Sequence, residues 1–439
     1  MQSAAARDPR AVPFADRAQR VQLSRRSFLL GMGAAVAGLG LAAWRQWPDE
    51  GLWNPCRPLP MPDHLARHAM VTAAWSGLDA AQVWDTHVHL LGAAGEADGA
   101  WVNPDMTSVA HPFELIHFKL YANAACADGP GELLAGNYLA RLAALHEAFP
   151  LGARLVLLAM DYFHDEAGNR VPARTMFQVS DAYAQRAAAR HPQRFEWCAS
   201  IHPYRPDCVA ALEWAAAHGA RAVKWIPSMM GIDPASPRCD RFYEALARAG
   251  LPLVTHGGNE HPLEGSAAPA LNNPLALRRA LDHGVRVVIA HCAGAGSGID
   301  TDRGPNGPEV ENFALFARLM DDPRYHGRLY GDLAAVTEES RVGPVLARIV
   351  QTKDWQGRLL NGSDYPLPGY MPAFSLRRLA DAGFLSADEA LTLREIRTYN
   401  PLLFDFVLKR RIAVDGERLP PAVFETARHF GDHRANRAP

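Results

Sequence analysis

Short apolar runs recur along this chain of 439 residues, and they restrict its fold more than any other feature. Continuous apolar runs of about four to seven residues are typical of strands in a parallel sheet, where both faces are buried. Amphipathic segments that favour helix lie between the runs, for example at 240–249, 273–283 and 342–351. The predicted strands are 82–87, 154–160, 195–201, 220–226, 252–256, 285–290, 328–332 and 358–361.

The spacing of these runs favours one architecture. Polar residues at the ends of the last five runs, from Lys224 to Asp364, follow one another at intervals of 32 to 41 positions. A strand–helix–strand unit needs roughly 30 residues or more. Eight such units predict an α/β protein with a (β/α)8 TIM barrel, whose active site lies at the C-terminal ends of the strands. A doubly wound open sheet is the competing fold, but the glycine fingerprint that it would favour after the first strand is missing.

Two long stretches interrupt the alternation. The first runs from position 91 to about 150, after the first strand, and the second from 161 to about 174, after the second strand. We expect loop insertions of this length, on the side of the barrel that carries the active site, to shape or cover a substrate pocket.

Five titratable residues come directly after apolar runs. His87 and His89 end the first run, His256 and His291 end the fifth and sixth, and Asp364 follows the eighth. Alternating side chains put His87 and His89 on the same face of a strand. A lone His-x-His pair is a weak motif, but in a barrel all five residues converge on the axis. Three histidines and a carboxylate match the ligand set of a zinc-type site.

With these residues, the chain resembles the amidohydrolase superfamily, in particular its amidohydrolase-related branch, also called amidohydrolase 2. The resemblance covers roughly residues 82–405 and includes the Gly-Ser-Asp-Tyr-Pro phrase at 362–366 and the Asn-Pro pair at 400–401. The branch contains hydrolases, lactonases and non-oxidative decarboxylases. The resemblance therefore implies a metal-dependent enzyme, but it does not select the substrate.

The resemblance also implies roles for the five residues. His87, His89, His256 and Asp364 would bind one divalent metal, most often zinc, with manganese as an alternative. His291 would act as a base or polarise the substrate carbonyl, and Asp364 would also take part in catalysis by accepting a hydrogen bond from the metal-bound water. A metal with an open position lowers the pKa of its water and acts as a Lewis acid.

Further residues have less defined roles. Lys224, in the fourth run, is expected either to bridge a second metal as a carboxylated lysine or to remain unmodified and contact a carboxylate or the substrate. His202, Trp225 and Asn259 are candidates for pocket lining. Asp332, which ends the seventh run, is a candidate polar residue of the same lining.

The first 50 residues differ from the rest. A polar, basic stretch ends in Arg25-Arg26, and a Gly/Ala-rich apolar run then extends to Trp44. This pattern resembles a twin-arginine export signal, cleaved or retained as a membrane anchor. We therefore expect a signal or anchor over 1–50, a linker with a short helix over 51–80, the barrel over 81–410, and a C-terminal tail over 411–439. The protein would reside in the periplasm or on the outer face of the cytoplasmic membrane.

Composition narrows the function further. The formal net charge of −2 gives no reason to expect a nucleic-acid partner. The six cysteines include no Cys-x-x-Cys pair and are too few for a disulfide scaffold.

We predict a hydrolase that activates water for attack on an amide, ester or lactone carbonyl of a small molecule. The alternatives are a non-oxidative decarboxylase of an aromatic or unsaturated acid, and a catalytically silent metal-binding barrel. A homodimer is expected by analogy with other barrels of this type.

Overall fold

The computed structural model describes residues 48–92, 99–129, 131–258 and 269–431. The chain divides into two units, 1–47 and 48–439, and all described residues belong to the second. Most of the predicted signal or anchor, 1–50, therefore lies outside the described residues. Within the described part of the chain, no helix combines the length and the apolar character needed to cross a membrane.

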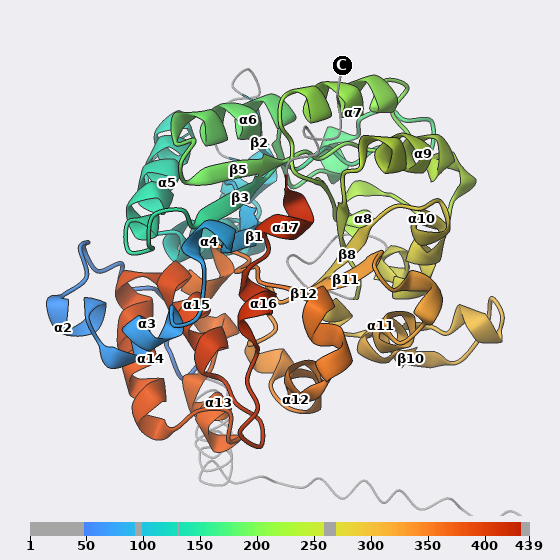
Figure 1. Cartoon of the computed structure of the whole chain (residues 1–439). Helices are drawn as coiled ribbons and strands as arrows, with labels where there is room; N and C mark the ends of the chain where they lie inside the picture. Colours follow the sequence, from blue (N-terminus) through green and yellow to red (C-terminus); the bar gives the residue numbers. More distant parts are fainter. Residues whose placement is uncertain (1–47, 93–98, 130, 259–268, 432–439) are drawn as a thin grey trace, which may run out of the picture. The chain divides into compact units, whose positions relative to one another are not determined.

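Eight parallel strands form the centre of the described unit (Figure 1). They belong to two sheets, ordered β1-β3-β5 and β12-β11-β8-β7-β6. Parallel bridges from Ala199 to Val223 and from Val88 to Tyr365 connect the edges of the two sheets. The strands therefore follow one another in sequence order around a (β/α)8 barrel. They are β1 (Trp84–His89), β3 (Arg154–Leu158), β5 (Phe195–Cys198), β6 (Val223–Trp225), β7 (Leu253–His256), β8 (Val287–Ala290), β11 (Leu329–Asp332) and β12 (Leu359–Leu360).

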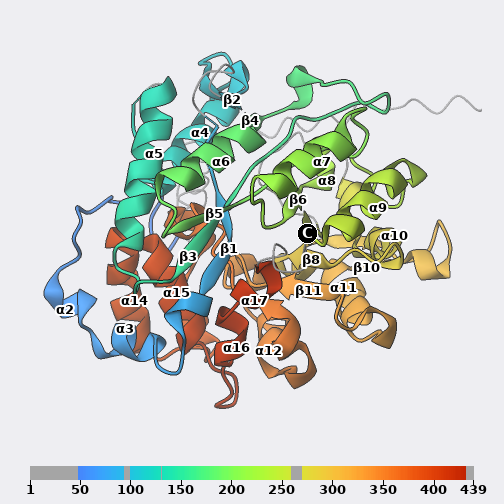
Figure 2. The same ribbon diagram turned by 45° about the horizontal axis from the view of Figure 1, so that its top comes forward.

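The structure confirms the predicted fold class, and each predicted strand overlaps one observed strand. The helices surround the strands in both views (Figures 1 and 2). Helix α9 has the same bounds as the predicted segment 240–249. It ends there because Gly250 adopts φ +69° and forms a left-handed turn. The helices that connect successive barrel strands, or follow the last, are α5 (Gly131–His146), α6 (Asp181–Arg190), α7 (Cys208–Ala217), α9 (Asp240–Ala249), α10 (Arg278–Asp282), α11 (Asn312–Met320), α12 (Pro344–Gln351) and α15 (Pro401–Arg411).

Further helices lie near the ends of the described unit and in the loops. The linker predicted over 51–80 contains two short helices in place of one. The additional helices are α2 (Asp63–Ala66), α3 (Ala69–Ala74), α4 (Pro112–Ala124), α8 (Pro227–Met230), α13 (Leu376–Asp381), α14 (Ala387–Tyr399), α16 (Pro421–Phe424) and α17 (Ala427–Phe430).

The two predicted insertions meet each other on the side of the barrel where the strands end. The first contains β2 (Ala100–Val102) and α4, and the second leads into β4 (Phe177–Val179). β2 and β4 pair as antiparallel strands. Each insertion therefore gains backbone hydrogen bonds from the other, and together they form a wall above the barrel.

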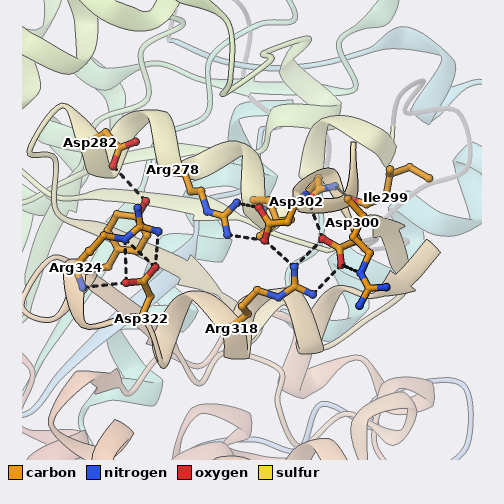
Figure 3. Close-up of polar contacts among 12 residues, drawn as sticks. Arg278, Asp282, Ile299, Asp300, Asp302, Arg318, Asp322 and Arg324 are labelled. Atoms are coloured by element: carbon orange, nitrogen blue, oxygen red, sulfur yellow. Dashed lines mark hydrogen bonds and ion pairs between the residues drawn. The ribbon is translucent and has the colours of Figure 1, made fainter. Parts of the chain in front are cut away.

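A third long loop, which we call the β9–β10 excursion, follows β8. It contains the hairpin of β9 (Ser297–Ile299) and β10 (Glu309–Glu311). Ion pairs attach this excursion to the outer helices (Figure 3). Arg318 on α11 donates to both carboxylate oxygens of Asp300, at 2.7 and 2.9 Å, and to Asp302 at 2.7 Å. Arg278 on α10 forms a bidentate pair with Asp302. The network holds a loop that the sequence does not identify as an insertion.

The described part of the predicted C-terminal tail, 411–431, packs against the barrel. Phe430 and Ala427 on α17 pack against a cluster of inward-facing residues from the barrel strands. Thr426 donates to the carbonyl of Trp84 at 2.6 Å, at the start of β1. The last helix of the described residues therefore fills the N-terminal end of the barrel. The barrel residues in this cluster are Trp84, Val156, Leu158, Cys198, Ala222, Val254, Val288 and Leu360.

A disulfide between Cys56 and Cys126 joins the N-terminal linker to the end of α4. Asn54 and Asn123 exchange two hydrogen bonds beside it, at 2.8 and 3.0 Å. Cysteine spacing alone did not predict this pairing, because the two residues are 70 positions apart.

Candidate metal centre

His87 and His89 reach the same space because strand alternation sends Val88, between them, into the surrounding core. The strand is fixed on both sides of the pair. The amide of Asp364 donates to the carbonyl of His87 at 2.8 Å, and the amide of His89 donates to the carbonyl of Tyr365 at 2.9 Å. These bonds place the first and last elements of the barrel side by side and bring Asp364 to the two imidazoles.

His256 and His291 complete the histidine cluster. His256 lies at the end of β7, and His291 follows β8 with φ +56°. The ring of His291 lies 4.8 Å from that of His256 and 5.2 Å from that of His87, measured between ring centroids. A left-handed backbone is rare for a residue other than glycine, and such strain concentrates at functional sites.

Asp364 also has a left-handed backbone, with φ +61°. Its Oδ1 lies 3.0 Å from Nε2 of His89 and 3.3 Å from Nε2 of His87. The preceding glycine, Gly362, allows this approach, because a Cβ at that position would lie 2.8 Å from the Cβ of His87. The Gly-Ser-Asp phrase seen in the sequence therefore has a steric basis.

The five residues fit a divalent metal. Two overlapping groups, His87–His256–His291 and His87–His89–Asp364, each bring three ligand atoms within 4.8 Å of one another. Neither ring nitrogen of His256 has a hydrogen-bond partner among the described residues, and the same holds for Nε2 of His291. Buried polar atoms without partners are rare and unfavourable. A metal ion would satisfy them.

Asp332 orients the centre from behind. Its Oδ2 accepts a 2.7 Å hydrogen bond from Nδ1 of His87, and its Oδ1 accepts from the backbone amides of His291 and Ala334 at 3.0 and 2.9 Å. The ring of His291 is fixed in turn by a 2.8 Å bond from its Nδ1 to the carbonyl of Ala334. Both rings therefore keep Nε2 for the centre, as in carboxylate–histidine–metal arrangements.

The sequence indicates Asp332 only as a candidate for polar lining, whereas in the structure it is the partner of His87. Its position at the end of the seventh strand, in register with His256, His291 and Asp364, is the sequence signal for this role. Asp85 on β1 is also buried, and its Oδ1 accepts from the amides of His87 at 3.1 Å and Ser363 at 2.8 Å. These bonds connect β1 to the segment that carries Asp364.

Lys224 lies at the cluster, as predicted. Its Nζ is 2.8 Å from Nε2 of His87, and the side chain is fully buried on β6. The single lone pair of Nε2 serves one partner at a time, so the ammonium group and a metal compete for it. This position is compatible with the bridging role, whereas Lys224 is not part of the cavity wall where it would contact a substrate.

The protonation states suit metal binding. Burial and the nearby Lys224 lower the pKa of His87 to about 4, and burial lowers the pKa of His256 well below its ordinary value. Burial opposes the charged form of Asp364, but the neighbouring His87 and His291 hold its pKa well below the ordinary range. Neutral imidazoles and ionised carboxylates are the forms that bind metals.

A cavity of about 820 Å³ opens directly onto the centre. His89, His256 and Asp364 are part of its wall, whereas His87 and His291 lie behind them with no exposed surface. The first insertion contributes to the wall through residues such as Val102, and β4, which follows the second insertion, contributes through Phe177. The predicted role in shaping the pocket therefore agrees with the placement of the first insertion, whereas none of the residues 161–174 is part of the wall.

The structure places the predicted lining residues differently. Trp225 faces away from the barrel axis, because it follows the inward-facing Lys224, and it stacks on Phe242 of α9 at 5.5 Å between ring centroids. His202 is buried, and both of its ring nitrogens form hydrogen bonds with backbone groups. Its Nε2 donates to the carbonyl of Met230 at 2.9 Å, and its Nδ1 accepts from the amide of Tyr204 at 3.2 Å. Neither residue is part of the cavity wall. Asn259 lies outside the described residues.

A buried His and Asp cluster at the C-terminal ends of the strands of a (β/α)8 barrel, beside a cavity, is the arrangement of a metal-dependent barrel enzyme. A family model described as "Amidohydrolase" matches residues 84–394. The chain belongs to this family and is an enzyme of the amidohydrolase type.

Solved structures with similar folds share little sequence with this chain. An uncharacterized TIM-barrel protein from Bordetella bronchiseptica is 16% identical, with a TM-score of 0.44, and the match covers 66% of this chain and 89% of that one. A probable 2-pyrone-4,6-dicarboxylic acid hydrolase from Acinetobacter baumannii is 13% identical, with a TM-score of 0.40 and coverages of 71% and 95%. The 5-carboxyvanillate decarboxylase from Sphingomonas paucimobilis is 12% identical, with a TM-score of 0.41, and the match covers 79% of this chain and 98% of that one. The comparison with curated proteins finds no match.

Proposed function

We propose that the protein is a metal-dependent hydrolase that acts on an amide, ester or lactone carbonyl of a small molecule. The observation that carries this proposal is the position of His89, His256 and Asp364 on the cavity wall. A substrate carbonyl in the cavity can therefore reach the centre directly. His87, His89, His256 and Asp364 would hold the metal. When bound, one divalent ion, zinc by its ligand set and with manganese as the alternative, supplies Lewis acidity at the carbonyl and lowers the pKa of water.

The chain's own groups would manage the proton. Asp364 borders the cavity and is held ionised, so it can accept a proton from the attacking water and return it to the leaving group. His291 has no exposed surface, and its free Nε2 faces the histidine cluster. It is therefore better placed to complete or polarise the centre than to meet the substrate, a narrower role than the sequence indicated.

A substrate screen with product analysis tests the reaction. The metal-loaded protein is incubated with lactones, esters, amides and aromatic acids in ¹⁸O-labelled water. Hydrolysis predicts label in the product acid and no carbon dioxide. Carbon dioxide release without label would identify the decarboxylase alternative. Unchanged turnover in both His291→Ala and Asp364→Ala would contradict the assignment of this centre, and no turnover with any substrate would favour a silent barrel.

We also propose export by the twin-arginine route to the periplasm or to the outer face of the cytoplasmic membrane, with the N-terminal segment as signal or tether. The Cys56–Cys126 disulfide supports this location, because disulfides persist mainly in oxidising compartments. Fractionation of cells that express the full chain tests the proposal. Export should be lost when Arg25 and Arg26 are both replaced by lysine, and cytoplasmic residence of both forms would contradict it.

The partner that we propose is a small-molecule substrate, without nucleic acid. A homodimer, expected by analogy with related barrels, is tested by light scattering of the purified protein, and a monomeric mass at micromolar concentration would reject it.

A further inference from the structure

The volume of the cavity and the side chains of its wall indicate which kind of molecule it can bind. Its volume of about 820 Å³ lies in the upper part of the range for sites that enclose drug-sized ligands. Most wall side chains outside the metal centre are apolar, and they include methionines and aromatic rings from several separate elements of the fold. Examples are Met106, Phe118, Met176, Phe177, Met229 and Phe313. Such a wall gains free energy by excluding water from an apolar ligand.

The charged side chains of the cavity wall also favour an uncharged ligand body. Of the described residues that line the cavity, Arg341 is the one that carries a permanent positive charge. It is only 3% exposed, and its guanidinium donates to the carboxylate of Glu338 and, at 3.1 Å, to the carbonyl of Ala335. Its charge is therefore already neutralised. Glu311 adds a further carboxylate to the wall.

Among the described residues of the wall, a second anionic group on the substrate would thus find only a cation that is already paired with a carboxylate. The burial of a carboxylate without a partner is strongly unfavourable. The stretches 93–98 and 259–268, which lie outside the described residues, contain no lysine or arginine in their sequence. One anionic or carbonyl group can be accepted at the metal centre, but the rest of the molecule faces apolar side chains and carboxylates.

We infer that the substrate of the proposed reaction is a bulky, mainly apolar molecule whose body, away from the reacting group, carries no anionic substituent. This inference rests on the proposed function and narrows it to a substrate class. Small dicarboxylates are excluded from that class. Aryl or alicyclic esters, amides and lactones belong to it.

A competition experiment with two matched ligands tests the inference without turnover. The full-length, metal-loaded protein is titrated with the neutral fluorophore N-phenyl-1-naphthylamine, which is then displaced by 6-acetyl-2-naphthoate or by naphthalene-2,6-dicarboxylate. Each competitor offers one carboxylate to the metal, and they differ only in the charge of the distal group. The acetyl compound should displace the probe at a concentration at least about 10-fold lower. Equal potency, or a preference for the dicarboxylate, would overturn the inference.

Two variants of one helix locate the effect in the cavity. Phe118 on α4 lines the cavity, whereas Phe113 on the same helix is 76% exposed. Phe118→Arg should weaken probe binding and reduce the preference for the acetyl compound. Phe113→Arg should leave both unchanged, and equal effects of the two variants would place the probe outside the cavity and overturn the inference. If Phe118→Arg fails to fold, the comparison of competitors on the unaltered protein still decides.

The two proposals fail separately. If the preference for the acetyl compound is found but no carbonyl substrate is hydrolysed, the reaction is wrong and the binding class stands. If hydrolysis is found and the dicarboxylate binds equally well, the substrate class alone is wrong.

Discussion

Nδ1 of His87 and Oδ2 of Asp332 lie 2.7 Å apart, and neither side chain has any exposed surface. Contacts with His87 hold the pKa of Asp332 below its ordinary value despite burial, which alone would raise it. The carboxylate thus fixes the tautomer of His87, and Nε2 remains the ligand atom. This pair joins the seventh strand of the barrel to the first.

Replacement of Asp332 should weaken metal binding without the loss of a ligand. Asp332→Asn keeps the shape of the side chain but removes its charge, and such partners of ligating histidines typically contribute about 10- to 100-fold in affinity. Competition with a chromophoric chelator measures the change. Asp322→Asn is the control, because Asp322 pairs with Arg324 outside the barrel. Unchanged affinity in Asp332→Asn would mean that the pair has only a structural role.

Metal removal should destabilise the fold. The unpartnered nitrogens of His256 and the compressed group of buried imidazoles are left without compensation when no ion is bound. A ligand bound only to the native state at 100 times its Kd adds about 2.7 kcal/mol. Differential scanning calorimetry should therefore show a lower Tm after dialysis against a chelator, with recovery on reloading. An identical Tm in both states would contradict metal binding at this centre.

The Cys56–Cys126 disulfide should contribute substantially to stability. It closes a loop of 70 residues, for which the chain-entropy model gives about 4 kcal/mol. Urea unfolding should show a loss of this order in the Cys56→Ser/Cys126→Ser double variant. A thiol reductant should destabilise the unaltered protein, and it should leave the double variant unaffected. Equal sensitivity to the reductant would show that the bond does not form.

The ion-pair network around Arg318 should make the β9–β10 excursion sensitive to acid. The guanidinium groups of Arg278 and Arg318 lower the pKa of Asp302, and Arg318 lowers that of Asp300. A carboxylate whose pKa falls on folding stabilises the native state above its unfolded pKa of about 3.9 and loses this contribution as the pH falls towards the folded value.

Arg318→Ala should therefore lower Tm at neutral pH, and the gap between variant and unaltered protein should narrow below about pH 4. Thermal unfolding followed by circular dichroism at several pH values measures this gap. Arg324→Ala, which removes a neighbouring exposed pair, is the matched control and should have a smaller effect. A constant gap from pH 7 to pH 3 would contradict the electrostatic origin.

The sequence was sufficient for the barrel and for the convergence of His87, His89, His256, His291 and Asp364. Parallel topology brings the ends of strands together, so register along the chain translates into proximity. Successive side chains of a strand point to opposite faces, so Lys224 on the inner face places Trp225 on the outer face. The sequence therefore contained the information that Trp225 does not line the pocket.

Other features depended on contacts between distant segments. The pairing of Cys56 with Cys126 and the packing of Phe430 inside the barrel leave no local pattern, because each depends on how far-separated segments meet. The bond between Asp332 and His87 belongs to the same group, since a strand-end aspartate has the same local pattern whether it faces solvent or a histidine.

Metal content per chain tests the central claim most directly. Elemental analysis of the purified protein should give about one equivalent of a divalent metal. His256→Ala should lose most of it, and Asp322→Asn should keep it. About two equivalents, falling to one in Lys224→Ala, would establish a bridging lysine and contradict the single-metal account. No metal in the unaltered protein after reloading, or full occupancy in His256→Ala, would contradict the centre itself.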